Sequence, residues 1–296
     1  MARTAKSRVS PVSLAGKVVA ITGGARGIGK ASAQAFLDGG ALVAIGDIDD
    51  ELAEKTAVEL GARPGAVVAG LRLDVTDRAS FEGFLDAAET ALGAPVDVLV
   101  NNAGIMPTGL HAAEDDRMTD RQIDINLRGV ITGSKLAARR FAERGGHIVN
   151  IASLAGVVGY PGLATYCATK HAVVGYTEAL WGELHKGPVA VSAVLPGVVR
   201  TELSAGAKVP KALERITTVD PEEVAAAVTQ AVLTRKPKVV VPKSAGATLK
   251  SMSLLSTRAK FAMGRLLKLD VMFTESDPAM RERYHRRITP TTGEPS

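Results

Sequence analysis

The 296-residue sequence predicts an α/β fold in which a parallel sheet of seven strands is covered by helices on both faces. From Lys17 to Pro242, short runs of apolar β-branched residues alternate with longer alanine-rich segments of helical period. Each longer segment is long enough to cross over between two parallel strands. With 46% hydrophobic and 23% charged residues, the composition is that of a folded globular chain, not of a disordered or fibrous one.

Seven apolar runs are predicted strands. In chain order they are Val18–Thr22, Leu42–Gly46, Ala66–Arg72, Val96–Asn101, Gly146–Ile151, Val189–Leu195 and Lys238–Val241. The segments between them are predicted helices: Gly29–Leu37, Glu51–Leu60, Ser80–Leu92, Arg117–Arg144, Tyr166–Leu184 and Pro221–Leu233. The segment Thr201–Val219 has no clear period and is predicted to be a loop, which either covers a site or is an ordinary surface excursion.

The net charge of +5 is concentrated at the two ends of the chain. Residues 1–12 contain three basic and no acidic side chains, and residues 243–268 contain six basic and no acidic ones. We therefore expect three parts: a basic N-terminal tail (1–13), a slightly acidic main domain (14–243) and a helical basic extension (244–296).

Cysteine usage and hydropathy indicate the class of protein. Cys167 is the single cysteine, so no intrachain disulfide forms, and the cysteine and histidines do not have the spacing of metal ligands. No run approaches the about 20 apolar residues that a membrane span needs, and the N-terminal residues lack the apolar core of a signal peptide. We expect a cytoplasmic protein without a bound metal.

The first predicted strand runs directly into a glycine-rich turn that precedes a helix. The turn reads Gly23-Gly24-Ala25-Arg26-Gly27-Ile28-Gly29. Such glycines permit a tight turn and let the backbone approach a pyrophosphate, which the helix N-terminus then attracts. Three residues separate Gly23 from Gly27, so the spacing differs from GxGxxG, and the strand-turn-helix context carries the prediction of dinucleotide binding.

Asp47 follows the second predicted strand, eighteen residues after Gly29. A carboxylate at this place accepts hydrogen bonds from the adenosine ribose hydroxyls and repels a 2′-phosphate, which favours NAD over NADP. Arg26 is a counter-signal, because a cation in the turn attracts a 2′-phosphate. We give Asp47 the greater weight because the carboxylate is the closer group.

Ser153, Tyr166 and Lys170 form the candidate catalytic group. Ser153 follows the fifth predicted strand, at the sheet edge where open α/β sheets bind ligands. Tyr166 and Lys170 are four residues apart and share one face of a helix. A nearby ammonium favours the phenolate and lowers the tyrosine pKa toward neutrality, as a general acid/base requires.

In combination these features resemble the short-chain dehydrogenase/reductase family in its common single-domain form, over roughly residues 14–243. Seven motifs of that family occur in order: Thr22-Gly23-x-x-x-Gly27-x-Gly29, Asp74-Val75, Asn101-Asn102-Ala103-Gly104, Asn126, Ser153, Tyr166 with Lys170, and Pro196-Gly197 followed by Thr201. The resemblance implies a Rossmann-like doubly wound sheet, hydride transfer with NAD, and a homodimer or homotetramer.

The resemblance also implies roles for individual residues. Tyr166 would transfer the proton at the substrate oxygen, and Ser153 would polarise that oxygen. Lys170 would bind the nicotinamide ribose, and Asn126 would hold a water that joins Lys170 to solvent. The other implied cofactor contacts run along one groove: Gly23, Arg26, Gly27, Ile28, Gly29 and Asp47 at the turn and ribose, Asp74 and Val75 at the adenine, Asn102, Ala103 and Gly104 at the centre, and Pro196, Gly197, Val199 and Thr201 at the nicotinamide.

The predicted substrate is a small hydrophobic alcohol or ketone of steroid, retinoid or lipid type. The residues expected at the pocket are mostly apolar, with no cation placed to hold a carboxylate or phosphate: Ile105, Met106, Leu154, Val158, Tyr160 and Leu203. Packing of some of these side chains in the core is an equally open interpretation. A non-catalytic dinucleotide-binding protein, or a membrane-associated scaffold on the same fold, is the alternative function.

The basic extension has a candidate helix over residues 249–269. Apolar residues fall on one stripe of it and most cations lie opposite. This pattern fits packing against the body or a neighbouring subunit, or peripheral contact with an anionic membrane surface. Nucleic acid is disfavoured as a partner, because no aromatic residues interleave with the basic ones.

Overall fold

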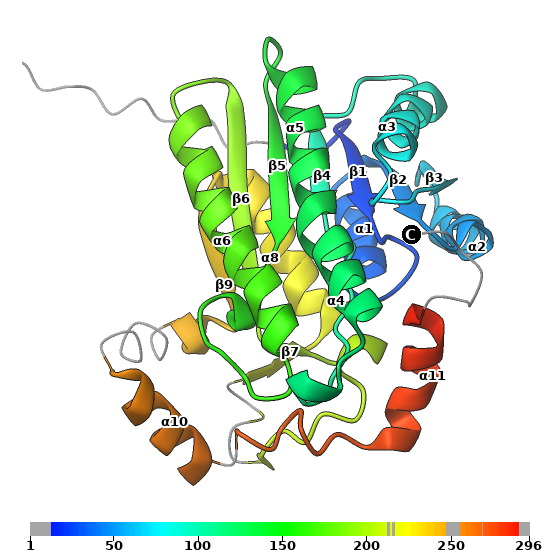
Figure 1. Cartoon of the computed structure of the whole chain (residues 1–296). Coiled ribbons are helices and arrows are strands. Elements are labelled where there is room, and N and C mark those ends of the chain that lie inside the picture. The colour runs from blue at the N-terminus through cyan, green and yellow to red at the C-terminus, as the bar shows by residue number, and fades with distance from the viewer. Residues whose placement is uncertain (1–12, 212–213, 215–216, 247–254, 268, 290–296) are drawn as a thin grey trace, which may run out of the picture.

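The computed structural model describes residues 13–211, 214, 217–246, 255–267 and 269–289. Its centre is a seven-stranded, all-parallel sheet with the order β3-β2-β1-β4-β5-β6-β9, which confirms the predicted fold class (Figure 1). The strands of this sheet are β1 (Val18–Thr22), β2 (Leu42–Asp47), β3 (Val68–Arg72), β4 (Val98–Asn101), β5 (Gly146–Ile151), β6 (Val189–Pro196) and β9 (Lys238–Val241).

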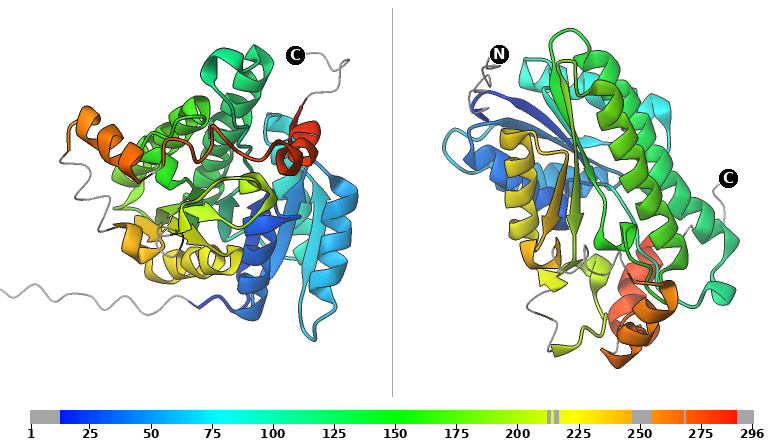
Figure 2. Two further views of the ribbon diagram at one scale, coloured as in Figure 1. Left: turned by 90° about the horizontal axis from the view of Figure 1, so that it is seen from below. Right: turned by 90° about the vertical axis from the view of Figure 1, so that its left-hand side faces the viewer.

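Helices cover both faces of the sheet (Figure 2). One face packs against α1 (Gly27–Asp38), α2 (Asp50–Gly61) and α8 (Pro221–Thr234). The other packs against α3 (Arg78–Leu92), α5 (Gly129–Phe141) and α6 (Ala164–Leu184). Because the strands are buried on both sides, their sequences are almost entirely apolar, as in β1, where all five residues are buried.

The predicted helix over Arg117–Arg144 is interrupted in the structure. It consists of α4 (Asp116–Ile123), a π-helical turn (Asp124–Arg128) and α5. The π turn contains Asn126, whose amide bonds both backbone polar groups of Ile105. Such single-turn insertions have no periodicity of their own in a sequence, and they occur often at functional sites.

The segment predicted as a loop, Thr201–Val219, contains little regular structure among its described residues. A short parallel pair, β7 (Val198–Val199) and β8 (Thr218–Val219), holds its two ends together. Its first residues pass along the carboxyl ends of the sheet strands. These ends are where ligands bind in open α/β sheets.

The C-terminal extension contains two helices, α10 (Thr257–Leu266) and α11 (Pro278–Ile288). The helix predicted over 249–269 therefore begins later than expected, at Thr257, because Ser256 caps it by accepting a hydrogen bond from the backbone N–H of Ala259 (3.3 Å). Residues 249–254 and 268 of that prediction, like the N-terminal residues 1–12, lie outside the described part. Helix α11 has no counterpart among the predicted helices.

The two helices of the extension lie differently on the body. Figure 1 shows α10 standing apart from the sheet, and none of its residues is buried. In contrast, α11 lies at the carboxyl edge of the sheet, and it contributes Arg281, Tyr284 and Ile288 to the interior. In the described part of the chain, no helix is long and apolar enough to span a membrane.

Candidate active site

A long cavity of about 1650 Å³ runs along the carboxyl ends of the strands. It begins at the ends of β2 and β3, passes the ends of β1 and β4, and continues to those of β5 and β6. The strand order reverses between β1 and β4, the place where doubly wound sheets bind nucleotides. Single-ligand pockets usually measure about 300–1,000 Å³, so this cavity has room for a dinucleotide and a substrate together.

The glycine turn is closely packed. A Cβ atom on Gly29 would lie 2.1 Å from the carbonyl oxygen of Gly23, so only glycine fits there. The Asn102 amide donates hydrogen bonds to the carbonyls of Thr22 and Gly23, at 2.9 Å each. The turn and the segment after β4 are thereby held together, and the N-terminus of α1 faces the cavity, as binding of a pyrophosphate requires.

Asp47 lies at the adenosine end of the cavity. Its side chain is 9% exposed, and its Oδ2 accepts a hydrogen bond from the backbone N–H of Ala25 (3.2 Å). The Arg26 guanidinium, the counter-signal in the sequence, forms an ion pair with Asp49 (2.7 Å). The one cation of the Gly23–Gly29 turn is therefore already paired with Asp49, and it also lies 3.9 Å from Glu202.

Tyr166 and Lys170 are buried side by side on the first turns of α6. Lys170 Nζ lies 5.7 Å from the centre of the Tyr166 ring and donates a hydrogen bond to the carbonyl oxygen of Ile151 (2.9 Å). The Ser153 hydroxyl forms a hydrogen bond with that of Tyr166. The three side chains meet at the end of β5 and all line the cavity.

The pKa of Tyr166 differs from the sequence-based expectation. Burial raises it above its ordinary value, and the hydrogen bond with Ser153 opposes this only in part. Burial also lowers the pKa of Lys170 to about 8. The expected lowering of the Tyr166 pKa by Lys170 is not seen, because the ammonium is directed to Ile151 and desolvation of the phenolate dominates.

Asn126 holds the segment that follows β4. Its Oδ1 accepts a hydrogen bond from the N–H of Ile105 (2.8 Å), and its Nδ2 donates to the carbonyl of Ile105 (2.9 Å) and to Thr169 Oγ1 (3.3 Å). The side chain is completely buried. Asn126 therefore fixes the backbone of Ile105 at the cavity. The family resemblance implies a water-binding role in addition.

The structure brings most of the predicted site residues to one cavity. It is lined by Gly23, Arg26, Gly27, Ile28, Asp47, Asp74, Val75, Asn102, Ala103, Gly104, Ser153, Leu154, Tyr160, Tyr166, Lys170, Pro196, Gly197, Val199 and Thr201. Gly29 and Asn126 lie behind this surface and support it. Val158 does not line it, because its turn folds back, with the N–H of Val158 bonded to the carbonyl of Leu154.

The C-terminal extension contributes a wall of the cavity that was not predicted from the sequence. Six of its residues line the cavity: Leu269, Met272, Phe273, Tyr284, Arg287 and Ile288. A signal was present in the sequence, since Arg281, Tyr284 and Ile288 are spaced as one helix face after the helix-starting pair Asp277-Pro278.

The model of the short chain dehydrogenase family matches residues 17–211. The chain belongs to this family. This confirms the family resemblance that the motifs predicted. The match ends before the extension, so α10 and α11 lie outside the part that the family model describes.

Named relatives agree with this assignment. The chain is 38% identical to a 3beta-hydroxysteroid dehydrogenase 2 of Eggerthella lenta over 69% of this chain and 79% of the relative. It is 36% identical to the probable oxidoreductase EphD of Mycobacterium tuberculosis over 64% of this chain, a match that spans only 32% of EphD.

A solved structure has the same fold. The short chain dehydrogenase/reductase of Burkholderia phymatum, in complex with NAD, superposes with a TM-score of 0.73 at 29% identity, covering 81% of this chain and 93% of the other. That neighbour contains NAD, the cofactor that the sequence predicts for this chain.

Proposed function

We propose that this protein is an NAD(H)-dependent oxidoreductase that interconverts a hydrophobic secondary alcohol and the corresponding ketone. The observation that carries the proposal is the single cavity with Asp47 at one end and Ser153, Tyr166 and Lys170 at the other. NAD, when bound, supplies or accepts the hydride. The residues of the chain orient the reactants and move the proton.

The assignment of roles follows from the contacts. The hydroxyls of Ser153 and Tyr166 lie within hydrogen-bonding reach of each other, so a substrate oxygen that takes the place of this bond can accept a hydrogen bond from each. Tyr166 is the proton donor in reduction and the acceptor in oxidation. Lys170, held against the carbonyl of Ile151, is placed to bind the nicotinamide ribose.

The proposed preference for NAD over NADP rests on Asp47. A 2′-phosphate would face the carboxylates of Asp47 and Asp49, and the one cation of the turn, Arg26, is already paired with Asp49. Repulsion between like charges in a partly buried site therefore disfavours NADP.

The proposed substrate is apolar. Beyond the catalytic group, the cavity wall is formed by aliphatic, sulfur and aromatic side chains, among them Leu154, Tyr160, Leu163, Met272 and Phe273. The relative from Eggerthella lenta is named for a hydroxysteroid, which supports a substrate of polycyclic or similar size.

The experiment follows the absorbance of NADH with a panel of hydrophobic alcohols and ketones, for wild type and Tyr166→Phe. We expect the variant to lose about 10²- to 10⁴-fold in turnover, because the proton donor is removed, while NAD binding measured by calorimetry is retained. Tyr176→Phe is the matched control, since Tyr176 lies on the same helix but outside the cavity lining. Near-normal turnover by Tyr166→Phe would refute the assignment, and a non-catalytic binding protein would bind NAD without any turnover.

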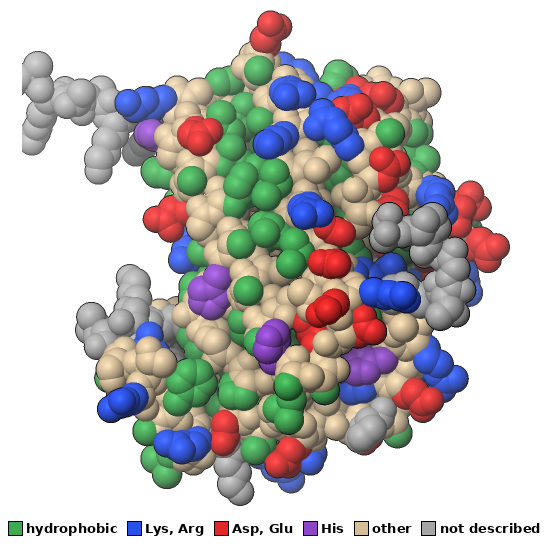
Figure 3. All heavy atoms as spheres, viewed as in Figure 1, with side chains coloured by type: hydrophobic (Ala, Val, Ile, Leu, Met, Phe, Trp, Pro, Cys, Tyr) green, Lys and Arg blue, Asp and Glu red, His purple; other side chains and the backbone are tan. Residues whose placement is uncertain are grey.

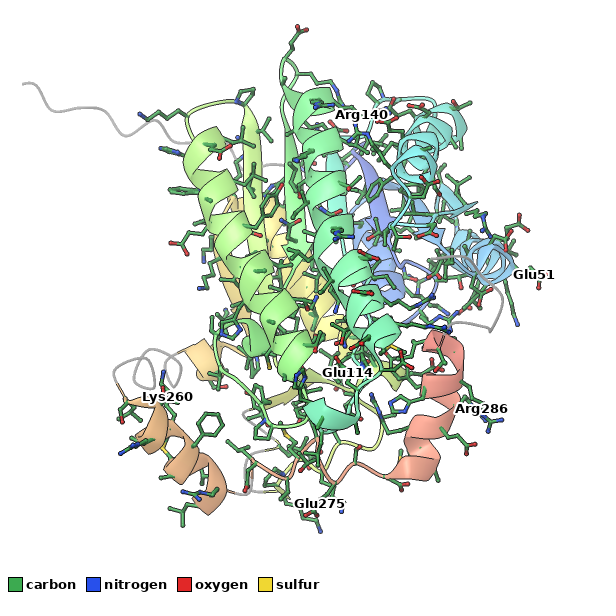
Figure 4. The ribbon with its side chains drawn as sticks, in the orientation of Figure 1. Glu51, Glu114, Arg140, Lys260, Glu275 and Arg286 are labelled. Atoms are coloured by element: carbon green, nitrogen blue, oxygen red, sulfur yellow. The ribbon has the colours of Figure 1, made fainter. Side chains whose placement is uncertain are left out.

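Two further partners are proposed. Association of copies of this chain into a dimer or tetramer is supported by the half-exposed Trp181 and by the apolar side chains that Figure 3 shows over the outer surface of the helical layer. Peripheral contact with an anionic membrane is supported by α10, which exposes Phe261 and Leu266 beside basic side chains (Figure 4 labels Lys260).

A further inference from the structure

Helix α11 is fixed across the mouth of the cavity by one buried arginine. Arg281 is only 2% exposed, and its guanidinium donates hydrogen bonds to the carbonyls of Met106 and Leu203, each at 2.6 Å. Met106 follows β4 and Leu203 follows β7, and both residues line the cavity. Helix α11 therefore joins two segments of the site that are far apart in the sequence.

Tyr284 lies one turn after Arg281 on the same face of α11. It is 4% exposed and lines the cavity, and its hydroxyl oxygen accepts a hydrogen bond from the N–H of Met106 (2.8 Å). The guanidinium groups of Arg281 and Arg287 lie 4.8 and 5.4 Å from the centre of its ring. The phenol is thereby held in one orientation.

The hydroxyl hydrogen of Tyr284 has no acceptor within the described part of the chain. Its oxygen already accepts from Met106, so the hydrogen is directed away from that N–H. Polar groups as deeply buried as this one are normally paired, and here the neighbouring space is the cavity. Tyr284 and Tyr166 line the same cavity.

We propose that Tyr284 is a substrate-binding residue that donates a hydrogen bond to a second, non-reacting oxygen of the substrate. The inference rests on the proposed function and specifies its substrate class. The substrate is an apolar skeleton that carries two oxygens: one reacts between Ser153 and Tyr166, and the other is an acceptor such as a ketone. The apolar wall of Leu163, Met272, Phe273 and Ile288 surrounds the skeleton.

The test compares two probes with one skeleton, a saturated steroid monoketone and the diketone with a second carbonyl at the opposite end. Dissociation constants of both are measured on the NAD-loaded protein by calorimetry, and kcat/KM is measured by NADH absorbance. The variant is Tyr284→Phe, which removes a single oxygen. Arg286→Gln is the matched control on the same helix, because Arg286 is exposed and points away from the body (Figure 4).

We expect wild type and Arg286→Gln to bind the diketone more tightly than the monoketone. Tyr284→Phe should lose about three- to tenfold for the diketone and little for the monoketone, since one hydrogen bond is removed. The variant also deprives the N–H of Met106 of its acceptor, but such a structural effect weakens both probes alike.

Three outcomes separate the proposals. Equal losses for both probes, or a rise in the KM for NAD alone, would overturn the role of Tyr284. If the enzyme turns over but Tyr284→Phe has the same preference between diketone and monoketone as wild type, the oxidoreductase proposal stands and this inference is refuted. If Tyr284→Phe loses the preference for the diketone but no substrate is turned over by wild type, the binding site is supported and the proposed reaction is refuted.

Discussion

Asp47 is the residue on which the choice between NAD and NADP depends. It ends β2, it is almost completely buried, and its two carboxylate oxygens accept backbone N–H groups from Ala25 and Asp49. These contacts fix the side chain before a cofactor arrives. A carboxylate held in this way contributes to affinity without a further cost of ordering.

Replacing Asp47 by serine should therefore weaken the preference for NAD over NADP. We expect the KM for NAD to rise about tenfold, because hydrogen bonds from the ribose hydroxyls to a charged group are lost. The KM for NADP should fall, because the repelling charge is removed. Steady-state kinetics with both cofactors provide the measurement, and Asp50→Asn, an equal change of charge on the exposed start of α2, is the control. An unchanged ratio of NAD to NADP efficiency in Asp47→Ser would contradict this role.

The identities of the catalytic residues could be predicted from the spacing of single residues in the sequence, but the pKa of Tyr166 could not. The spacing of Tyr166 and Lys170 places them on one helix face whatever surrounds them. The pKa of Tyr166 depends instead on burial, to which an electrostatic contribution from Tyr284, far away in the sequence, is added. A lysine four residues away was therefore an insufficient basis for predicting a lowered tyrosine pKa.

At the level of elements, the strands and most helices could be predicted because their periodicity is local. The π turn around Asn126 and the docking of α11 could not. The contact between Arg281 and Met106 joins residues 175 positions apart, and no local pattern states which backbone carbonyl a buried arginine will reach. The basic stripe of residues 249–269 is the more conspicuous pattern in the sequence, although α10 buries none of its residues.

The attachment of α11 should be measurable as stability. Arg281→Met keeps the unbranched stem but leaves the carbonyls of Met106 and Leu203 without their donor. We expect a loss of about 2–4 kcal/mol in the free energy of unfolding, because buried acceptors are left unpaired. Urea denaturation followed by circular dichroism checks this value. Arg286→Met on the exposed face should change stability by no more than about 0.5 kcal/mol, and equal effects of the two variants would show that Arg281 does not anchor the helix.

At the scale of the whole molecule, the sheet separates two apolar layers, and the functional residues gather at its carboxyl edge. The opposite end of the sheet carries a different polar feature, His147 on β5. His147 is 4% exposed, and its Nε2 lies 2.8 Å from the hydroxyl oxygen of Ser192. Ser192 donates its own hydrogen to the carbonyl of Lys236, so the Nε2 of His147 is the donor of this bond. Burial of the ring then favours the neutral imidazole, because a charged ring would lose its hydration.

Protonation of His147 should make the whole fold sensitive to acid. Burial, with a smaller contribution from Arg235, lowers the pKa of His147 from 6.5 to about 3. Between these values the unfolded chain binds a proton that the folded protein does not, so the contribution to stability is complete above about pH 6.5 and is lost as the pH falls toward about 3. The loss for this one group is about 1.4 kcal/mol per pH unit within that window. Urea denaturation between pH 7 and pH 4 should show a shallower decline in His147→Gln than in wild type, whereas His111→Gln, a change at an exposed histidine, should follow wild type. If His147→Gln declined as steeply as wild type, the acid sensitivity would have to arise from other groups of the fold.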